Sequence, residues 1–138
     1  MAEKSLIDSG PIVALFDKDD SYHSQAVETI KVYQGKLFST LAVVTEVCYL
    51  LDFSVAAQSD FLSWIRLGGT QLVEVTSQDL VRVVELINKY SDRPMDFADS
   101  SLVAIGERLN IANIFTVDSD FDVYRLNKNK PFTNLFFR

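Results

Sequence analysis

Aspartates follow two apolar runs of this 138-residue chain at the point where each run ends. Asp8 follows the run that begins at residue 5, and Asp118 follows the run 114–117. Ligands of open parallel sheets bind outside the carboxyl ends of the strands, at the point where the strand order reverses, so one crevice is predicted to receive both carboxylates. Aspartate also begins turns frequently, and for either residue alone that simpler interpretation stays open.

Glu46 is the only ionisable residue between Leu41 and Leu51. If this stretch is a helix, its neighbours three and four positions away, Val43 and Leu50, are apolar. A charge in such surroundings is costly unless it is paired or binds a metal, so Glu46 is predicted to have a partner. The alternative is an exposed helix face that happens to be rich in apolar residues.

Two further groups of acids lie later in the chain. Asp96 and Asp99 stand at the cap and third position of a predicted helix, where the helix dipole favours carboxylates. Apolar residues surround Asp99 in the sequence. Asp118, Asp120 and Asp122 crowd a short turn with no basic residue before position 125, and a cation would relieve their repulsion.

Four of these acids, Asp8, Glu46, Asp99 and Asp118, are predicted to meet in one pocket. Oxygen ligands, with a single histidine and a single cysteine in the whole chain, favour Mg²⁺ or Mn²⁺ over zinc. Such a cation lowers the pKa of a bound water and neutralises charge on a phosphodiester. The predicted reaction class is therefore metal-assisted phosphodiester hydrolysis.

The elements that must position these acids alternate between strand and helix. Strands are predicted at 5–8, 36–39, 70–75 and 113–117, and helices at 10–16, 20–33, 41–53, 57–67, 77–90 and 97–109. This alternation predicts an α/β fold, with a parallel sheet covered by helices on both faces. The length and the absence of linkers or repeats predict a single domain over residues 1–138.

Four stretches, in this order, resemble the acidic motifs of the PIN-domain nucleases and, more narrowly, of the VapC-type toxin ribonucleases of VapBC toxin-antitoxin modules. The stretches are Leu6-Ile7-Asp8-Ser9, residues 43–47, residues 95–104 and residues 116–121. The resemblance spans residues 6 to about 125. It implies a three-layer α/β/α sandwich with a parallel central sheet, dependence on Mg²⁺ or Mn²⁺, endonucleolytic cleavage of RNA, a homodimer and a cognate antitoxin partner.

The resemblance also assigns roles by position. The implied catalytic, metal-binding carboxylates are Asp8, Glu46, Asp99 and Asp118, with Asp120 as an auxiliary ligand at most. Ser9 and Thr116 are predicted to orient neighbouring carboxylates by hydrogen bonds, and Asp96 fits a helix cap or a similar supporting role. Which of Asp118, Asp120 and Asp122 is the fourth ligand stays open.

The charge distribution bears on the RNA substrate. A net charge of −6 at first argues against nucleic acid, but residues 123–138 contain four basic residues and no acid, so residues 1–122 carry −10. This basic segment, with phenylalanines between its charges, is predicted to guide a single-stranded RNA backbone, and a final strand with a solvated edge is the alternative. Its predicted RNA-binding residues are Arg125, Lys128 and Lys130, and its phenylalanines are Phe132, Phe136 and Phe137.

The helices between residues 41 and 67 carry more apolar side chains than a monomer of this size needs to bury. A dimer or antitoxin contact is predicted there, with Tyr49, Phe53 and Trp64. No leader peptide or membrane-spanning stretch is recognised, and the lone Cys48 suits a reducing compartment, which predicts a cytoplasmic protein with no membrane partner.

Two other functions stay open from the sequence. One is a flavodoxin-like signalling or interaction module whose acidic pocket holds Mg²⁺. Such a receiver is expected to end a later strand with a lysine, whereas the fourth predicted strand ends in Asp118. The other is a catalytically idle PIN-like binding domain, which Mn²⁺ would stabilise without any cleavage of RNA.

Overall fold

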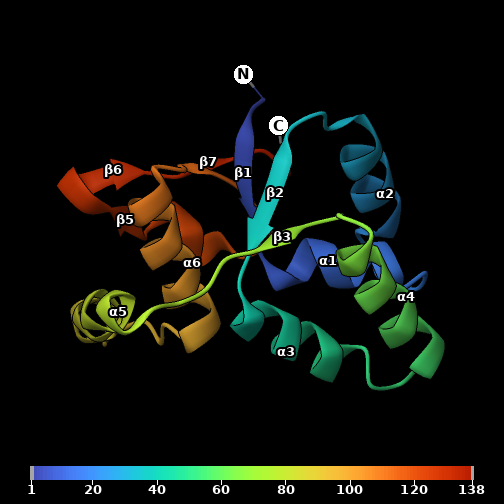
Figure 1. Ribbon diagram of the computed structural model, residues 1–138, viewed down its shortest axis with the longest axis horizontal. Coiled ribbons are helices and arrows are strands. Elements are labelled where there is room, and N and C mark those ends of the chain that lie inside the picture. Colours follow the sequence, from blue (N-terminus) through green and yellow to red (C-terminus); the bar gives the residue numbers. More distant parts are fainter. Residues whose placement is uncertain (1, 138) are drawn as a thin grey trace.

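A parallel five-stranded sheet forms the centre of the computed structural model, which describes residues 2–137 (Figure 1). The strand order is β3-β2-β1-β4-β7, and every neighbouring pair is parallel. The predicted parallel α/β fold is therefore confirmed. The strands are β1 (Lys4–Ile7), β2 (Lys36–Ser39), β3 (Gln71–Leu72), β4 (Asn113–Phe115) and β7 (Thr133–Asn134).

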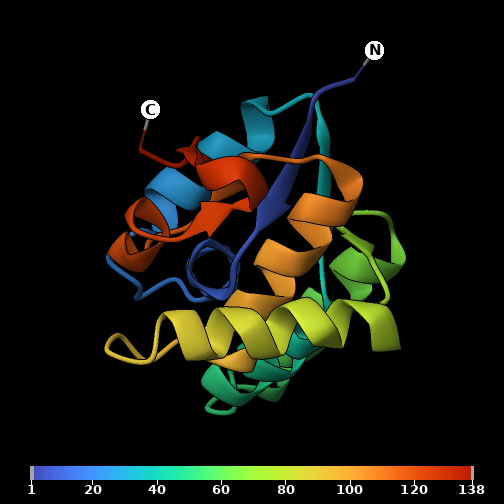
Figure 2. The ribbon, with the colours of Figure 1, turned by 90° about the vertical axis from the view of Figure 1, so that its left-hand side faces the viewer.

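Helices cover both faces of this sheet and make the fold a three-layer α/β/α sandwich. In Figure 1, α1, α2 and α4 lie on one side of the strands, and α5 and α6 lie on the other. Figure 2 shows α5 crossing over α6 on that second side. The helix α3 contacts both α1 and α6, and so closes one end of the sandwich. The helices are α1 (Ser9–Phe16), α2 (His23–Val32), α3 (Leu41–Leu50), α4 (Val55–Arg66), α5 (Ser77–Lys89) and α6 (Phe97–Leu109).

The strand order reverses between β1 and β4. From β1 the chain runs outward through β2 to β3, and it then returns to β4 on the other side of β1. In this pairing Ile7 lies opposite Phe115, and the Asp8 amide donates to the Phe115 carbonyl oxygen at 3.0 Å. The residues that directly follow β1 and β4 therefore lie side by side, as the rule for parallel sheets predicts.

Close packing brings α1 and α6 near these strand ends. A Cβ atom on Gly10 would overlap the side chain of Val117, so a glycine is required where α1 begins beside the end of β4. Residues 98–106 of α6 are all buried. Small side chains, among them Ser100, Ser101 and Gly106, let α6 lie against the sheet and its neighbours without overlap.

Four short strands depart from the sequence prediction. The third strand covers only residues 71–72 instead of 70–75. In the basic segment, β5 (Arg125–Leu126) and β6 (Lys130–Pro131) form an antiparallel hairpin, and β7 adds a fifth parallel strand beside β4. The alternative of a final strand is thus realised, because two-residue strands offer no alternation that a sequence pattern could reveal.

The α3–α4 face, which is the outer surface of these two helices, exposes many large apolar side chains. Trp64 is an exception among the residues predicted there, because its ring packs against Phe16 and Phe61 at centroid distances of 5.7 and 6.4 Å. The exposed apolar residues of this face are Leu41, Tyr49, Leu50, Phe53, Val55, Leu62 and Leu67. Within residues 2–137, no helix is long and apolar enough to cross a membrane.

Candidate metal centre

Both strand-end aspartates cap the helical turn that follows them. Asp8 Oδ1 accepts a hydrogen bond from the Ser9 amide at 2.8 Å at the start of α1. Asp118 Oδ1 accepts one from the Asp120 amide at 2.9 Å, at the start of the 3₁₀ helix η1 (Ser119–Asp122). The turn interpretation and the crevice interpretation are therefore both correct, because each cap also directs its carboxylate toward the reversal point.

Thr116 joins the two strand ends. Its buried hydroxyl donates to Asp8 Oδ2 at 2.9 Å and accepts from the Asp118 amide at 3.0 Å. Both oxygens of Asp8 are thus oriented, one by Ser9 and one by Thr116. These hydrogen bonds hold the carboxylates in place before any ligand binds.

Asp99 enters the same space from the first turn of α6. Asp96 caps this helix and accepts a hydrogen bond from the Asp99 amide at 2.8 Å. Asp8, Asp99 and Asp118 each offer one carboxylate oxygen, and these three oxygens all lie within 4.8 Å of one another. Three of the four predicted acids therefore form one cluster, called the aspartate triad below.

Burial and mutual repulsion make the triad hard to ionise. Burial raises the pKa of Asp99 to about 9, and the charges of Asp8, Asp96, Asp118 and Glu46 add to this effect. Burial also raises the pKa of Asp8 to about 6, although hydrogen bonds from Ser9 and Thr116 act in the opposite direction. The pKa of Asp118 is raised too, again chiefly by burial. At neutral pH the triad therefore needs either protons or a cation.

Glu46 lies at the rim of this cluster. It is half-buried, and its Oε1 accepts a hydrogen bond from the Ser9 hydroxyl. Its partner is thus a serine, and among the described residues it does not belong to the triad of closely spaced oxygens. Its charge nevertheless acts on both Asp8 and Asp99.

The remaining acids of the 118–122 turn lie outside the triad, although the side chain of Asp120 also contacts that of Asp118. The side chain of Asp120 forms an ion pair with Arg93 at 2.7 Å, and Asp122 is exposed. The sequence argument considered bases within the turn alone, whereas Arg93 reaches Asp120 from the loop before α6. The signal available in the sequence was its position three residues before the cap Asp96.

The chemistry of the triad fits a hard divalent cation. It offers carboxylate oxygens only, two of its three side chains are buried, and a positive charge between them would offset their repulsion. Asp8, Asp99 and Asp118 are the residues that would hold such an ion.

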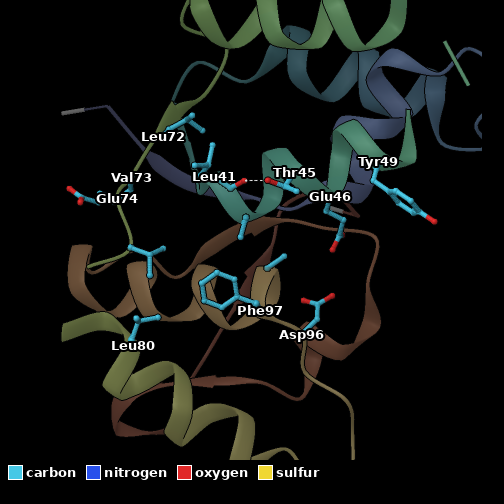
Figure 3. Close-up of a pocket in the computed structure, with 13 residues that line it drawn as sticks. Leu41, Thr45, Glu46, Tyr49, Leu72, Val73, Glu74, Leu80, Asp96 and Phe97 are labelled. Carbon is cyan, nitrogen blue, oxygen red and sulfur yellow. Dashed lines mark hydrogen bonds between the residues drawn. The ribbon is translucent and has the colours of Figure 1, made fainter. Parts of the chain in front are cut away.

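An apolar groove of about 1080 Å³ leads to one side of this site. Leu41 of α3, Leu72 of β3, Leu80 of α5 and Phe97 of α6 line it (Figure 3). Figure 3 also shows Glu46 and Asp96, the two acids at one end of the groove, on facing sides. The groove therefore combines an apolar floor with an acidic end.

The basic segment lies on another side of the fold. Lys128 borders a shallow depression with Glu107 and Arg108, near the carboxyl-terminal end of α6, whereas the triad lies at the amino-terminal end. Arg125 is half-buried, and its Nη1 donates to three backbone carbonyl oxygens of its own loop, those of residues 122–124. Phe136 is buried, so it belongs to the core and cannot stack on a base.

The known proteins that this chain resembles in sequence and in structure include several VapC and VapBC proteins. Ribonuclease VapC26 of Mycobacterium tuberculosis is 24% identical over 115 residues, which cover 82% of this chain and 85% of that protein. VapC20 of the same species, described as a sarcin-ricin loop cleaving toxin, has a solved structure with a TM-score of 0.77 and 21% identity, covering 86% of this chain and 92% of its own. VapBC2 of Rickettsia felis, solved with a DNA fragment from the promoter, has a TM-score of 0.65 and 15% identity, covering 95% and 98%.

The family assignment rests on a match to nearly the whole chain. The PIN domain model matches residues 5–126, a range that includes all four acidic stretches identified in the sequence. The resemblance to this family is therefore confirmed. The matched range covers strands β1 to β4 and the acids at the strand reversal. The chain is a member of the PIN domain family.

Proposed function

We propose that this PIN domain is a metal-dependent endoribonuclease that hydrolyses RNA phosphodiester bonds with Mg²⁺ or Mn²⁺, as the toxin of a toxin-antitoxin pair. The observation that carries the proposal is the aspartate triad at the strand reversal, because two buried carboxylates and a half-buried one so close together suit a divalent cation. The names of the relatives, a ribonuclease and VapC toxins, support the choice of RNA.

Each side chain of the site has a distinct part in this proposal. A bound cation supplies a water of lowered pKa and neutralises charge on the scissile phosphate. Asp8, Asp99 and Asp118 would hold the cation. Thr116 positions two of them, because its hydroxyl donates to the Asp8 carboxylate and accepts from the Asp118 amide. Glu46, whose Oε1 is engaged by Ser9, accepts the proton of the attacking water at Oε2.

The cation requirement provides the direct test. Protein stripped with EDTA is expected to leave single-stranded RNA intact, and excess Mn²⁺ or Mg²⁺ is expected to start internal cleavage. Gel analysis of labelled RNA measures the products, and single-stranded DNA of the same sequence is the control substrate. Cleavage that persists in EDTA would contradict the proposal. Stabilisation by Mn²⁺ without cleavage of any RNA pool would favour the idle binding domain instead.

For the substrate we propose contacts on two sides of the triad. Arg93, which forms an ion pair with Asp120 from the loop before α6, suits a phosphate close to the scissile bond. The exposed Lys128 and Lys130 suit the RNA backbone farther along, because Asp99 and Glu107 are eight positions, or about 12 Å, apart along α6. Arg125 is assigned mainly to holding its own loop together.

For the protein partner we propose that an antitoxin segment occupies the apolar groove. The lining favours apolar side chains, and the acids Glu46 and Asp96 at one end favour a basic residue of the partner. Solved toxin-antitoxin complexes among the structural neighbours support a partner of this kind. The part of the α3–α4 face outside the groove, with Leu50, Phe53, Val55, Leu62 and Leu67, is left for the proposed homodimer.

A charged substitution in the groove tests whether the antitoxin binds there or on the α3–α4 face. Leu80→Asp, at a side chain that is 44% exposed, is expected to weaken neutralisation by a co-expressed antitoxin at least about tenfold, since a buried unpaired charge costs well over 1.4 kcal/mol. Leu62→Asp on α4, which is 47% exposed, lies outside the groove and is the matched control. Growth rescue and affinity of the purified pair measure the effect. Equal neutralisation of both variants would contradict the assigned groove.

A further inference from the structure

Asn134, on the edge strand β7, binds both backbone groups of Thr116 with its side chain. Its Nδ2 donates to the Thr116 carbonyl oxygen at 3.0 Å, and its Oδ1 accepts from the Thr116 amide at 3.3 Å. The same Oδ1 accepts from the Phe136 amide at 3.0 Å. Each end of the side-chain amide thus meets groups of the opposite kind, and a flipped amide would satisfy none of these three partners.

These hydrogen bonds extend the pairing of β4 and β7 by one step beyond the strands. The backbone pairing ends where the Leu135 amide donates to the Ile114 carbonyl oxygen at 2.8 Å. In a parallel pair, the next groups to face β7 are the amide and carbonyl of Thr116, two residues farther along. Thr116 is fully buried, and buried backbone groups need partners. Because β7 ends at Asn134, the side chain of this residue supplies what a continuing strand would supply.

Thr116 is the residue through which Asn134 reaches the triad. Its hydroxyl donates to Asp8 Oδ2 at 2.9 Å and accepts from the Asp118 amide at 3.0 Å. Threonine is branched at Cβ and has few side-chain rotamers, so fixing its backbone on both sides of Cα also fixes the direction of its hydroxyl. A series of hydrogen bonds therefore runs from Asn134 through Thr116 to two members of the triad.

We propose that Asn134 is a positioning residue of the metal centre, which fixes Thr116 and through it Asp8 and Asp118. This inference rests on the proposed function. Asn134 lies outside residues 5–126, the range that the PIN domain model matches, so membership of the family does not assign it this role. Hydrogen bonds that orient metal ligands typically contribute about 10- to 100-fold to metal affinity or activity.

Gln25 of α2 supplies a matched control, because its side chain holds the same segment at another point. Its Nε2 donates to the Phe136 carbonyl oxygen at 2.6 Å, and among the described residues it makes no hydrogen bond to Thr116. Gln25→Ala and Asn134→Ala each remove an amide that binds the backbone near Phe136. Both are expected to unfold in EDTA at a lower temperature than the wild type, and only Asn134→Ala is expected to weaken metal binding.

The test combines calorimetry of Mn²⁺ binding with amide hydrogen exchange in EDTA. Asn134→Ala is expected to bind Mn²⁺ about tenfold more weakly and to exchange the Thr116 amide faster. At saturating Mn²⁺ it is expected to lower kcat with little change in KM for RNA. Gln25→Ala is expected to match the wild type in all of these measurements. Asn134→Ser keeps an acceptor for the Phe136 amide but cannot bridge both groups of Thr116, so this milder variant is expected to lose Mn²⁺ affinity as well.

A double-mutant cycle tests whether Asn134 acts through Thr116. Thr116→Val removes the hydroxyl and keeps the branched shape of the side chain. In this background Asn134→Ala is expected to cause little further loss of Mn²⁺ affinity, because the hydroxyl that it positions is already gone. Losses that simply add would show that Asn134 acts by another route and would contradict the inference.

Three further outcomes would overturn the inference. If the wild type and the two Asn134 variants bind Mn²⁺ equally well, Asn134 has only a structural role, while the proposed function stands. If Gln25→Ala loses as much affinity, loosening of the segment is sufficient, and the contact with Thr116 has no special part. If the wild type itself fails to bind Mn²⁺, the proposed function fails, and this inference fails with it.

Discussion

Asp99→Asn is expected to abolish cleavage of RNA and at the same time to stabilise the metal-free protein. The substitution removes one ligand of the triad, and loss of one electrostatic contact to a transition state typically lowers kcat by about 10²- to 10³-fold. In the absence of a cation, Asp99 must take up a proton on folding at neutral pH, whereas the amide of asparagine is already neutral, so folding becomes easier. Cleavage assays in Mn²⁺ and thermal unfolding in EDTA measure the two effects.

Asp79→Asn is the matched control, because Asp79 occupies the corresponding site of another helix. Both residues are 7% exposed, and both follow a capping residue by three positions at the start of a helix. Although burial acts to raise it, hydrogen bonds from Thr76 and Arg108 hold the pKa of Asp79 below its usual value. Asp79→Asn is therefore expected to lower stability and leave cleavage unchanged. An Asp99→Asn variant that cleaves like the wild type would contradict the assignment.

The metal-free wild type is expected to become less stable as the pH rises from about 4 to about 9. The folded-state pKa values of Asp8 and Asp99, about 6 and about 9, lie above the ordinary value of 3.8. Between these limits the folded state binds more protons than the unfolded state, so a rise in pH favours unfolding. The stabilisation is complete below pH 4, and it is lost through pH 6 for Asp8 and through pH 9 for Asp99. For Asp8 alone the change is roughly 3 kcal/mol.

Thermal unfolding at several pH values, in EDTA and in saturating Mn²⁺, measures this dependence. The difference between wild type and Asp99→Asn isolates the contribution of the triad from that of other titrating groups. With the cation at about 100 times its Kd, a gain of about 2.7 kcal/mol is expected at neutral pH, and the decline toward alkaline pH is expected to flatten. If stability in EDTA rose from pH 5 to 8 by the same amount in the wild type and in Asp99→Asn, ionisation of the triad would not oppose folding, and the prediction would be wrong.

The sequence was sufficient for those parts of the fold and site that depend on local pattern. Apolar runs that end in Asp8 and Asp118 predict strand ends, and the rule for parallel sheets then predicts that the two residues meet at the strand reversal. The capping position of Asp96 predicts the start of α6 in the same way. These features follow from periodicity and helix-end chemistry within a few residues.

Features that depend on distant partners were not predicted. The ion pair of Asp120 with Arg93 spans 27 residues of sequence, so no local pattern reveals it. Trp64 was predicted at the surface because a helical pattern does not reveal that Phe16, from α1, covers one side of it.

The first turn of α6 belongs to two sites at once. Asp99 contributes to the triad, while Asp96, Phe97 and Ala98 line the apolar groove. If a partner in the groove and a cation in the triad each shift this turn, thermodynamic linkage requires the two ligands to change each other's affinity by the same factor. The concentration of free divalent cation would then set how tightly the protein is held by its partner. Binding of the cation, which catalysis requires, and binding of the partner, which inhibits the protein, would then be thermodynamically coupled.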